Sequence, residues 1–384
     1  MRDRLSCQNK LAACVAPALA LLLSTTTAAI AEPKPTTAPS SVVAPALTGP
    51  FNWVDSGPLV SAHTDPTQKV VSIKDPSVVF YQGRWHVYAT CAKEFGENDG
   101  RWGMVYFNFT DWKDAGKAEQ VVLDKYPQFA GYHCAPQIFY FEPQKLWYLV
   151  YQSQHPTYST TTDLSKPETW TKPKPFFEGT PKSVVEGWLD YFVICDDTHA
   201  YLFFTDDHGR YYRSRTKLTD FPRGFDEPVV VLQEKVAREL FEGGCTYHIK
   251  GTNQYLTLIE AANENWTRYY KAFIADGLDG EWRPLAAEWG NSFADDTRVR
   301  SQDGKPLWSK GISHGELLRD GYDQTLTIDP ANLNLLYQGL HPGWDPKLNY
   351  VRLPYQLGVL HREVLPGEKP QPIPTPTKHV AGEK

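Results

Sequence analysis

The chain has 384 residues and a net charge of −6 with histidine neutral. It holds no run of basic residues, which argues against nucleic acid as a partner. Aromatic residues make up 13% of the chain. Some belong in strands, where they fit a pleated surface, and others could form flat platforms for sugar rings, but composition alone does not separate the two.

Both ends of the chain are expected to lie outside the folded domain. The basic start MRDRLSCQNK precedes an apolar run that ends in the small residues of Ala29-Ile30-Ala31. This pattern predicts a signal peptide over residues 1–31 and a secreted, extracellular protein that is not held in a membrane. A Pro/Ser/Thr-rich linker is expected over 32–50 and a Pro-rich disordered tail over 364–384. Residues 51–363 then form one domain, which we expect to act as a monomer.

Between these ends one kind of segment recurs: an apolar strand, a polar turn, and a second strand rich in Tyr and Trp. The copies start about 55–60 residues apart and are VVFYQGRWHVYAT from Val78, IFYFEPQKLWYLVYQ from Ile138, FVICDDTHAYLFFTD from Phe192 and YHIKGTNQYLTLIEA from Tyr247. A unit of this length holds roughly four strands, which suits a propeller blade. We therefore predict an all-β, five-bladed β-propeller. A two-sheet sandwich is the alternative, but it gives no reason for so long a period.

The fifth unit is the weakest copy. It starts near Trp308 and lacks a second strand rich in Trp and Tyr. Because ring closure often joins the two termini of a propeller in one blade, the segment FNWVDSGPLV from Phe51 is expected to supply the missing strand.

Acidic residues stand just ahead of the repeated strand in several units. In a propeller these first strands line the central channel, so the residues before them converge at one mouth. The positions are Lys74-Asp75-Pro76, Trp188-Leu189-Asp190, Phe241-Glu242-Gly243 and, in the fifth unit, His314-Gly315-Glu316, whereas Pro136-Gln137 offers no acid. Converging carboxyl groups suit glycoside hydrolysis, which needs one protonated acid and one ionised base. Taken singly, each acid could equally cap a turn or face solvent.

Other polar and aromatic residues leave their roles open. Asp196-Asp197 and Asp206-Asp207 are expected at turns away from the channel. Trp188 and Tyr132 could stack on sugar or pack in the core, and His314 could bind a ligand or be a satisfied core histidine. The four cysteines of the folded region, Cys91, Cys134, Cys195 and Cys245, allow three disulfide pairings, among which the sequence does not choose.

Together, these segments resemble glycoside hydrolase family 62, over about residues 51–361. The blocks that carry the resemblance are KDPSVVFYQGRWHVYAT, APQIFYF, GWLDYFVICDD, YLFFTDDHGRYYRS, GTNQYLTLIEA, ISHGELLRDGYDQTLTIDP and LLYQG. The resemblance implies a five-bladed propeller and a secreted α-L-arabinofuranosidase that removes arabinose side chains from arabinoxylan with inversion.

The resemblance also implies roles for single residues. By the matching segments, Asp75 is the general base, Asp190 orients the acid and tunes its pKa, and Glu242 is the general acid. Lys74 and Tyr337 match positions that line the arabinose pocket, and His314 matches a histidine near a structural calcium ion in the central channel. Tyr132, His133, Gln137 and Trp188 complete the expected substrate-binding set. The family often has Arg where this chain has His133, a difference expected to alter contact with the xylan chain.

Two other functions remain open from the sequence. One is a related five-bladed glycosidase that acts on arabinan or xylo-oligosaccharides. The other is a non-catalytic sugar-binding propeller, which would not need all three acids. The preference for O-2 or O-3 linkages is not encoded in any motif that we can interpret.

Overall fold

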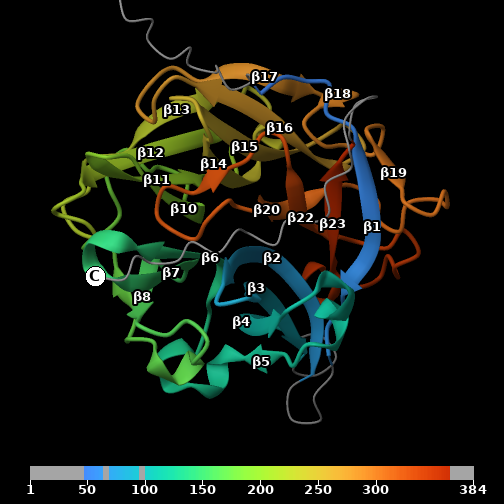
Figure 1. The fold of residues 1–384 in the computed structure, drawn as a ribbon, viewed down its shortest axis with the longest axis horizontal. Coiled ribbons are helices and arrows are strands. Elements are labelled where there is room, and N and C mark those ends of the chain that lie inside the picture. Colours follow the sequence, from blue (N-terminus) through green and yellow to red (C-terminus); the bar gives the residue numbers. More distant parts are fainter. Residues whose placement is uncertain (1–46, 64–68, 95–99, 364–384) are drawn as a thin grey trace, which may run out of the picture. The chain divides into compact units, whose positions relative to one another are not determined.

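The computed structural model describes residues 47–63, 69–94 and 100–363. These residues form five β-sheets arranged around a central axis, which confirms the predicted five-bladed propeller (Figure 1). The predicted signal peptide, most of the linker and the tail lie outside the described residues. The last linker residues already belong to the domain, because Leu47 is buried in its core.

The first three blades are four-stranded sheets in which the strands follow one another in sequence order. Blade 1 consists of β2 (Val70–Tyr81), β3 (Arg84–Glu94), β4 (Gly100–Phe109) and β5 (Val121–Val122). Blade 2 consists of β6 (Cys134–Phe141), β7 (Leu146–Gln152), β8 (Pro156–Thr161) and β9 (Lys174–Pro175). Blade 3 consists of β10 (Leu189–Cys195), β11 (His199–Thr205), β12 (Arg210–Lys217) and β13 (Val229–Gln233).

The last two blades are larger. Blade 4 consists of β14 (Glu242–Ile249), β15 (Tyr255–Ala262), β16 (Arg268–Ala275), β17 (Arg283–Glu288), β18 (Asn291–Ser292) and the short β21 (Thr327–Ile328). Blade 5 consists of β20 (Ser313–Leu317), β22 (Asn334–Gly339), β23 (Gln356–Arg362), β1 (Trp53–Val60) and β19 (Val299–Ser301).

Ring closure occurs in blade 5, as the sequence predicted. Strand β1, from the start of the domain, pairs antiparallel with β23, from its end. The indole of Trp53 is fully buried and donates to the carbonyl of Phe293 at 2.6 Å. The two ends of the domain therefore hold each other in one sheet.

All helical segments of the described residues are short 3₁₀ turns between strands. They are η1 (Trp112–Lys117), η2 (Leu123–Lys125), η3 (Pro127–Phe129), η4 (Glu142–Gln144), η5 (Pro167–Thr169), η6 (Ala237–Glu239) and η7 (Tyr350–Arg352). Within the described ranges, no helix is both long and apolar enough to cross a membrane.

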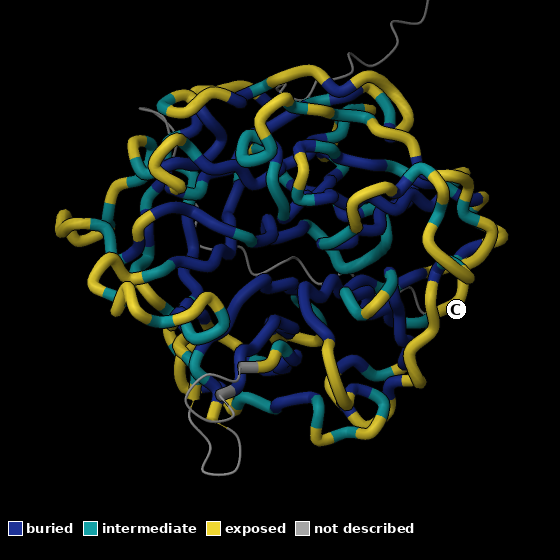
Figure 2. The backbone as a smooth tube through the Cα atoms, turned by 180° about the vertical axis from the view of Figure 1, so that it is seen from behind, coloured by how far each residue is buried: buried dark blue, intermediate teal, exposed yellow. Residues whose placement is uncertain are grey.

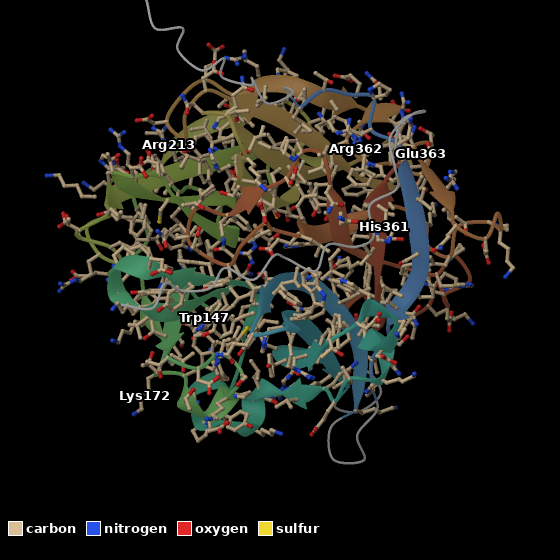
Figure 3. The ribbon with its side chains drawn as sticks, viewed as in Figure 1. Trp147, Lys172, Arg213, His361, Arg362 and Glu363 are labelled. Atoms are coloured by element: carbon tan, nitrogen blue, oxygen red, sulfur yellow. The ribbon has the colours of Figure 1, made fainter. Side chains whose placement is uncertain are left out.

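The repeated aromatic residues pack between the blades. Figure 2 shows buried backbone along the strands and exposed backbone at the loops. Trp147 of blade 2 is fully buried, and its ring lies 4.9 Å from that of Tyr81 in blade 1, whereas Lys172 is exposed at the periphery (Figure 3). Much of the aromatic content therefore serves packing.

One face of the propeller is closed by the segment between β20 and β22. Its carbonyl groups accept hydrogen bonds from Tyr140 N, Cys195 N and Lys250 N, at 2.8, 2.8 and 3.0 Å. These three residues stand at the far ends of the inner strands of blades 2, 3 and 4. The segment ties these blades together at the end of the channel opposite the acids.

Candidate active site

The inner strands share an irregularity near their first residues. In blades 1 to 4, one residue there has a left-handed backbone: Asp75 (φ 44°), Ala135 (φ 47°), Asp190 (φ 56°) and Gly243 (φ 64°). Each coincides with a break in the strand register, and β20 has such a break between Ser313 and Gly315. These are β-bulges, which redirect side chains next to functional sites. The acids therefore lie within the first strands, at bulges, and not before them.

The strand register shows whether the three acids occupy equivalent positions in their blades. The residue that pairs with the second strand just before each bulge is Lys74, Cys134, Leu189, Glu242 and Ser313 in blades 1 to 5. Asp75 and Asp190 hold the bulge position, which His314 occupies in blade 5, whereas Glu242 stands one residue earlier. The three acids converge, but from two neighbouring positions of the repeat.

A ring of hydrogen bonds joins the blades at these bulges. In each blade the amide at the bulge donates to a side-chain oxygen of the preceding blade. The pairs are Asp75 N to Gln338 Oε1 (2.7 Å), Ala135 N to Thr90 Oγ1 (2.7 Å), Asp190 N to Gln152 Oε1 (3.3 Å), Gly243 N to Asp190 Oδ2 (2.9 Å) and His314 N to Glu260 Oε2 (2.7 Å). Four acceptors lie on second strands. In blade 3 the matched residue is Thr205, which pairs with Leu189, but Asp190 accepts in its place and the Thr205 hydroxyl is buried without a partner.

A pocket of about 130 Å³ lies at the mouth of the channel, lined by residues of all five blades. It contains the three expected acids, Asp75, Asp190 and Glu242, together with Lys74 and His314. Pockets for drug-sized ligands typically measure about 300–1,000 Å³, so this one suits a single small ring.

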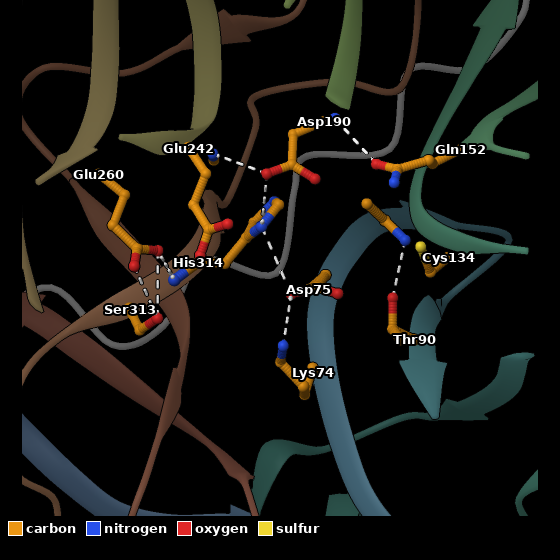
Figure 4. A network of polar contacts seen from close by, with 12 residues as sticks. Lys74, Asp75, Thr90, Cys134, Gln152, Asp190, Glu242, Glu260, Ser313 and His314 are labelled. Carbon is orange, nitrogen blue, oxygen red and sulfur yellow. Dashed lines mark hydrogen bonds and ion pairs between the residues drawn. The ribbon is translucent and has the colours of Figure 1, made fainter. Parts of the chain in front are cut away.

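Asp75 is held in the ionised state by two cations. Its Oδ1 lies 3.4 Å from His314 Nδ1 and 3.9 Å from Lys74 Nζ (Figure 4). Burial alone would raise the pKa of Asp75, but the charges of Lys74 and His314 outweigh it and lower this pKa below its ordinary value. An ionised carboxylate is what a general base requires.

Asp190 has the opposite electrostatic character. Burial, together with the charges of Glu242 and Asp75, raises the pKa of Asp190 to about 7 against the opposing charge of His314. Its Oδ2 accepts the amide of Gly243, the residue that follows Glu242, and lies 3.6 Å from His314 Nδ1. Two carboxyl groups of one pocket thus differ in protonation at mildly acidic pH, the condition for separate acid and base roles.

Glu242 is bound by an arginine that it shares with a second glutamate. Arg268 Nη1 donates to Glu242 Oε1 at 2.9 Å and to Glu260 Oε1 at 2.6 Å. Glu260 is fully buried and also accepts from the hydroxyl of Ser313 and the amide of His314. Glu242 is therefore anchored from outside the pocket by a buried network.

Lys74 lies in an aromatic cage beside Asp75. Its Nζ donates to the hydroxyl of Tyr350 at 2.9 Å and stands 4.8, 4.6 and 5.1 Å from the rings of Trp102, Tyr350 and Tyr355. Burial opposes its charge, yet the negative charge of Asp75 raises the pKa of Lys74 well above its ordinary value. Lys74 therefore remains a cation in the lining of the pocket.

Four of the expected substrate-binding residues lie outside the lining of this pocket and are packed in the protein. The Gln137 amide accepts from and donates to the backbone of Val193, at 2.7 and 2.8 Å, so it joins blades 2 and 3. Tyr337 is fully buried, with its ring 5.8 Å from that of Trp308. His133 is buried against Tyr151 and Phe129, and Trp188 is half-buried among aromatic rings.

Tyr132 is the expected binding residue that remains accessible. It is 44% exposed, and its hydroxyl accepts from Gln152, which lines the pocket. Two further exposed aromatic residues accompany the mouth: Tyr350, which lines the pocket, and Trp266, in the β15–β16 turn.

Several pocket residues were not expected from the sequence: Thr90, Trp102, Cys134, Gln152 and Tyr350. The ring position had a signal in two blades, since Gln152 ends and Glu260 interrupts a mostly apolar second strand. Trp102, near the start of β4, and Tyr350, in η7, had no such sequence signal, because only the folded chain brings them beside Lys74.

The two acidic pairs behave differently from each other. Asp196 caps the β10–β11 turn on the far face, as expected. Asp206-Asp207 instead follow Thr205 at the mouth face, which corrects the expectation that this pair lies away from the channel. Asp206 bonds Arg210 within its turn, whereas burial and the nearby charge of Glu242 raise the pKa of Asp207 to about 6.

Below the pocket is a cavity of about 10 Å³ on the axis, bordered by His314, Asp190 and Glu316. Its volume corresponds to one water molecule or ion. Calcium takes six to eight oxygen ligands, yet the described residues hold no group of three or more His, Cys, Asp or Glu that could bind a metal. Glu316 is already used by Ser77, Val78 and Arg319. The cavity fits an ion in size, but the protein ligands for calcium do not fit.

The four cysteines are unpaired and buried. Cys134 lines the pocket and donates to the hydroxyl of Tyr132 at 3.3 Å. Burial raises the pKa of each of these thiols, so they behave as small apolar groups.

Comparison with known proteins points in the same direction. The model of glycosyl hydrolase family 62 matches residues 52–361. The chain is 38% identical over 317 residues to alpha-L-arabinofuranosidase C of Cellvibrio japonicus, covering 82% of this chain and 47% of that protein. The chain therefore spans about half the length of that curated relative.

Solved structures are similar over nearly their whole length. The catalytic domain of a family 62 alpha-L-arabinofuranosidase from Coprinopsis cinerea superposes with a TM-score of 0.77 at 44% identity, covering 81% of this chain and 97% of that chain. A family 62 hydrolase in complex with xylotriose superposes with a TM-score of 0.76 at 41% identity, with the same coverage.

Proposed function

Since this chain belongs to glycosyl hydrolase family 62, we propose that it is an α-L-arabinofuranosidase that removes arabinofuranosyl side chains from arabinoxylan with inversion of configuration. The observation that carries the proposal is the pocket in which Asp75 and Asp190, whose pKa values shift in opposite directions, meet Glu242. A non-catalytic sugar-binding propeller would have no use for this arrangement.

In the proposed mechanism the acids divide the chemistry. Asp75, kept ionised by Lys74 and His314, takes a proton from the water that attacks the anomeric carbon of arabinose. Glu242 gives a proton to the departing xylose oxygen as the glycosidic bond breaks. Asp190 positions Glu242 through its hydrogen bond to Gly243 N, and its own raised pKa keeps a proton in the cluster.

Exposed aromatic residues at the mouth support a polymeric substrate. Tyr132, Tyr350 and Trp266 are 44%, 47% and 61% exposed, and exposed apolar surface beside a pocket often marks a binding site. Trp266 also has a left-handed backbone (φ 56°), an unusual conformation for a bulky residue. A relative was solved with xylotriose bound, so we propose that these rings contact the xylan chain while the pocket holds arabinose.

Product analysis tests the proposal. Wheat arabinoxylan treated with the enzyme should release arabinose with the backbone intact, and proton NMR at early times should show the anomer of inverted configuration. Shortening of the backbone, or release of arabinose only from arabinan, would favour the related propeller glycosidases. Binding without any hydrolysis would favour the sugar-binding propeller.

Three further features belong to the proposal. We propose that the enzyme is secreted by means of the signal peptide and acts as a monomer. A calcium ion, for which the described residues around the axial cavity do not supply the ligands, would have to take most of them from water, and it would serve stability alone. In that case EDTA should lower Tm and excess calcium should restore it, whereas an unchanged Tm would remove calcium from the proposal.

A further inference from the structure

A buried chain of hydrogen bonds connects the proposed base to the proposed acid through blades 4 and 5. From Asp75 the chain passes to Gln338 Oε1, and Gln338 Nε2 donates to Ser313 Oγ at 3.0 Å. The Ser313 hydroxyl donates to both oxygens of Glu260 at 3.1 Å. Arg268 then joins Glu260 to Glu242. Figure 4 shows the contact between Ser313 and Glu260.

The three middle residues of this chain are inaccessible to solvent. Gln338 is 2% exposed, Ser313 4% and Glu260 0%. Gln338 contacts the backbone amide of Asp75 and not its carboxyl group. None of the three residues lines the pocket. Their polar groups are costly to bury unless they are bonded, and each of the three residues is bonded to the next along this chain.

Each link in the chain has only one possible direction. Asp75 N is a donor, so the Gln338 oxygen must face it and the Gln338 nitrogen must face Ser313. The single proton of the Ser313 hydroxyl must then point to Glu260. Flipping the Gln338 amide would set two donors against each other at Asp75. The chain therefore has one arrangement, which fixes the bulge of Asp75 relative to the Arg268–Glu242 pair.

We propose that Gln338, Ser313 and Glu260 are positioning residues that set the separation between the base and the acid. This inference rests on the proposed function. In inverting glycosidases the two carboxyl groups must stand far enough apart to admit water, about 6.5–9.5 Å. A displacement of about 1 Å at a reacting group can cost roughly 100-fold in rate, so a rigid buried link between the two acids has a direct effect on catalysis.

The chain offers a matched control. Ser313 and Thr205 both carry buried hydroxyl groups beside an inner-strand bulge, but the Thr205 hydroxyl has no partner. Ser313→Ala and Thr205→Val each delete one hydroxyl. Only the first leaves Gln338 Nε2 without its acceptor and deprives Glu260 of a donor.

The experiment compares the two variants with the wild type on two substrates. For Ser313→Ala we expect kcat on arabinoxylan to fall about 10–100-fold, with KM nearly unchanged and a folded protein by circular dichroism. The loss should be smaller on an aryl arabinofuranoside with an activated leaving group, which needs little help from the acid. Thr205→Val should keep wild-type kinetics on both substrates.

Equal kinetics for Ser313→Ala and the wild type would overturn the inference. So would an equal loss on both substrates, because that pattern indicates general damage to the pocket. If Ser313→Ala does not fold, Gln338→Met, which keeps the volume and removes the link from the other side, is measured in the same way. Failure of the wild type to release arabinose from either substrate would instead reject the proposed function.

Discussion

Replacing Asp75 by Asn tests the assignment of the general base most directly. The change keeps the shape of the side chain, and Asn tolerates the left-handed backbone that Asp75 adopts at φ 44°. The hydrogen bond from the backbone amide to Gln338 does not involve the side chain. The fold and the bulge should therefore persist, and only the negative charge between Lys74 and His314 is lost.

The expected loss is large because Asn cannot take a proton from water, whereas the charges of Lys74 and His314 keep the Asp75 carboxylate ready to do so. A general base contributes about 10²–10⁴-fold, which corresponds to about 3–5 kcal/mol of transition-state stabilisation. The neighbouring carboxyl of Asp190 cannot substitute, since its pKa is raised to about 7 and its Oδ2 is committed to Gly243 N. We expect kcat on arabinoxylan to fall within this range with little change in KM.

The assay is initial-rate release of arabinose at several substrate concentrations, with Tm measured on the same preparations. Asp75→Gly, which removes the side chain and suits the left-handed backbone, should be partly rescued by azide attacking in place of water. The rescued product should be the arabinosyl azide of inverted configuration. A loss smaller than about tenfold in Asp75→Asn, with Tm close to that of the wild type, would refute the assignment.

Three other predictions follow from single contacts. The pKa of Asp190 rises from 3.8 to about 7 on folding, so the folded state holds its proton longer than the unfolded chain, and stability should fall as pH rises from about 4 to 7. Urea titrations at pH 5 and 8 should show this slope in the wild type and a smaller one in Asp190→Asn. Gly244→Ala should destabilise the fold by roughly 1–3 kcal/mol, because its Cβ would overlap the ring of Tyr211, whereas Gly179→Ala, with nothing nearby, should not. Trp266→Gly should keep or raise Tm by relieving the left-handed backbone while raising KM for arabinoxylan and not for aryl arabinofuranosides. An unchanged KM for the polymer would exclude Trp266 from xylan binding.

The blades could be predicted from the amino-acid sequence. Strands, turns and their period are local properties, since each unit builds a hairpin from consecutive residues. For the same reason the strand near Phe51 that closes the ring and the convergence of the three acids in one pocket were both predicted correctly. The family resemblance assigned roles to these acids, and these roles remain to be tested by the variants described above.

The contacts between the blades could not be predicted in this way, because they form only when the sheets pack together. The bulges place Glu242 one residue earlier in the repeat than Asp75 and Asp190, and a one-residue difference reverses the direction of a strand side chain. The residues whose side chains accept the amides of Asp75 and Asp190, Gln338 and Gln152, come from neighbouring blades, so these contacts depend on the stagger between sheets. No period along the chain encodes that stagger. It arises when the five sheets pack around one axis and each bulge amide meets an acceptor from the blade before it.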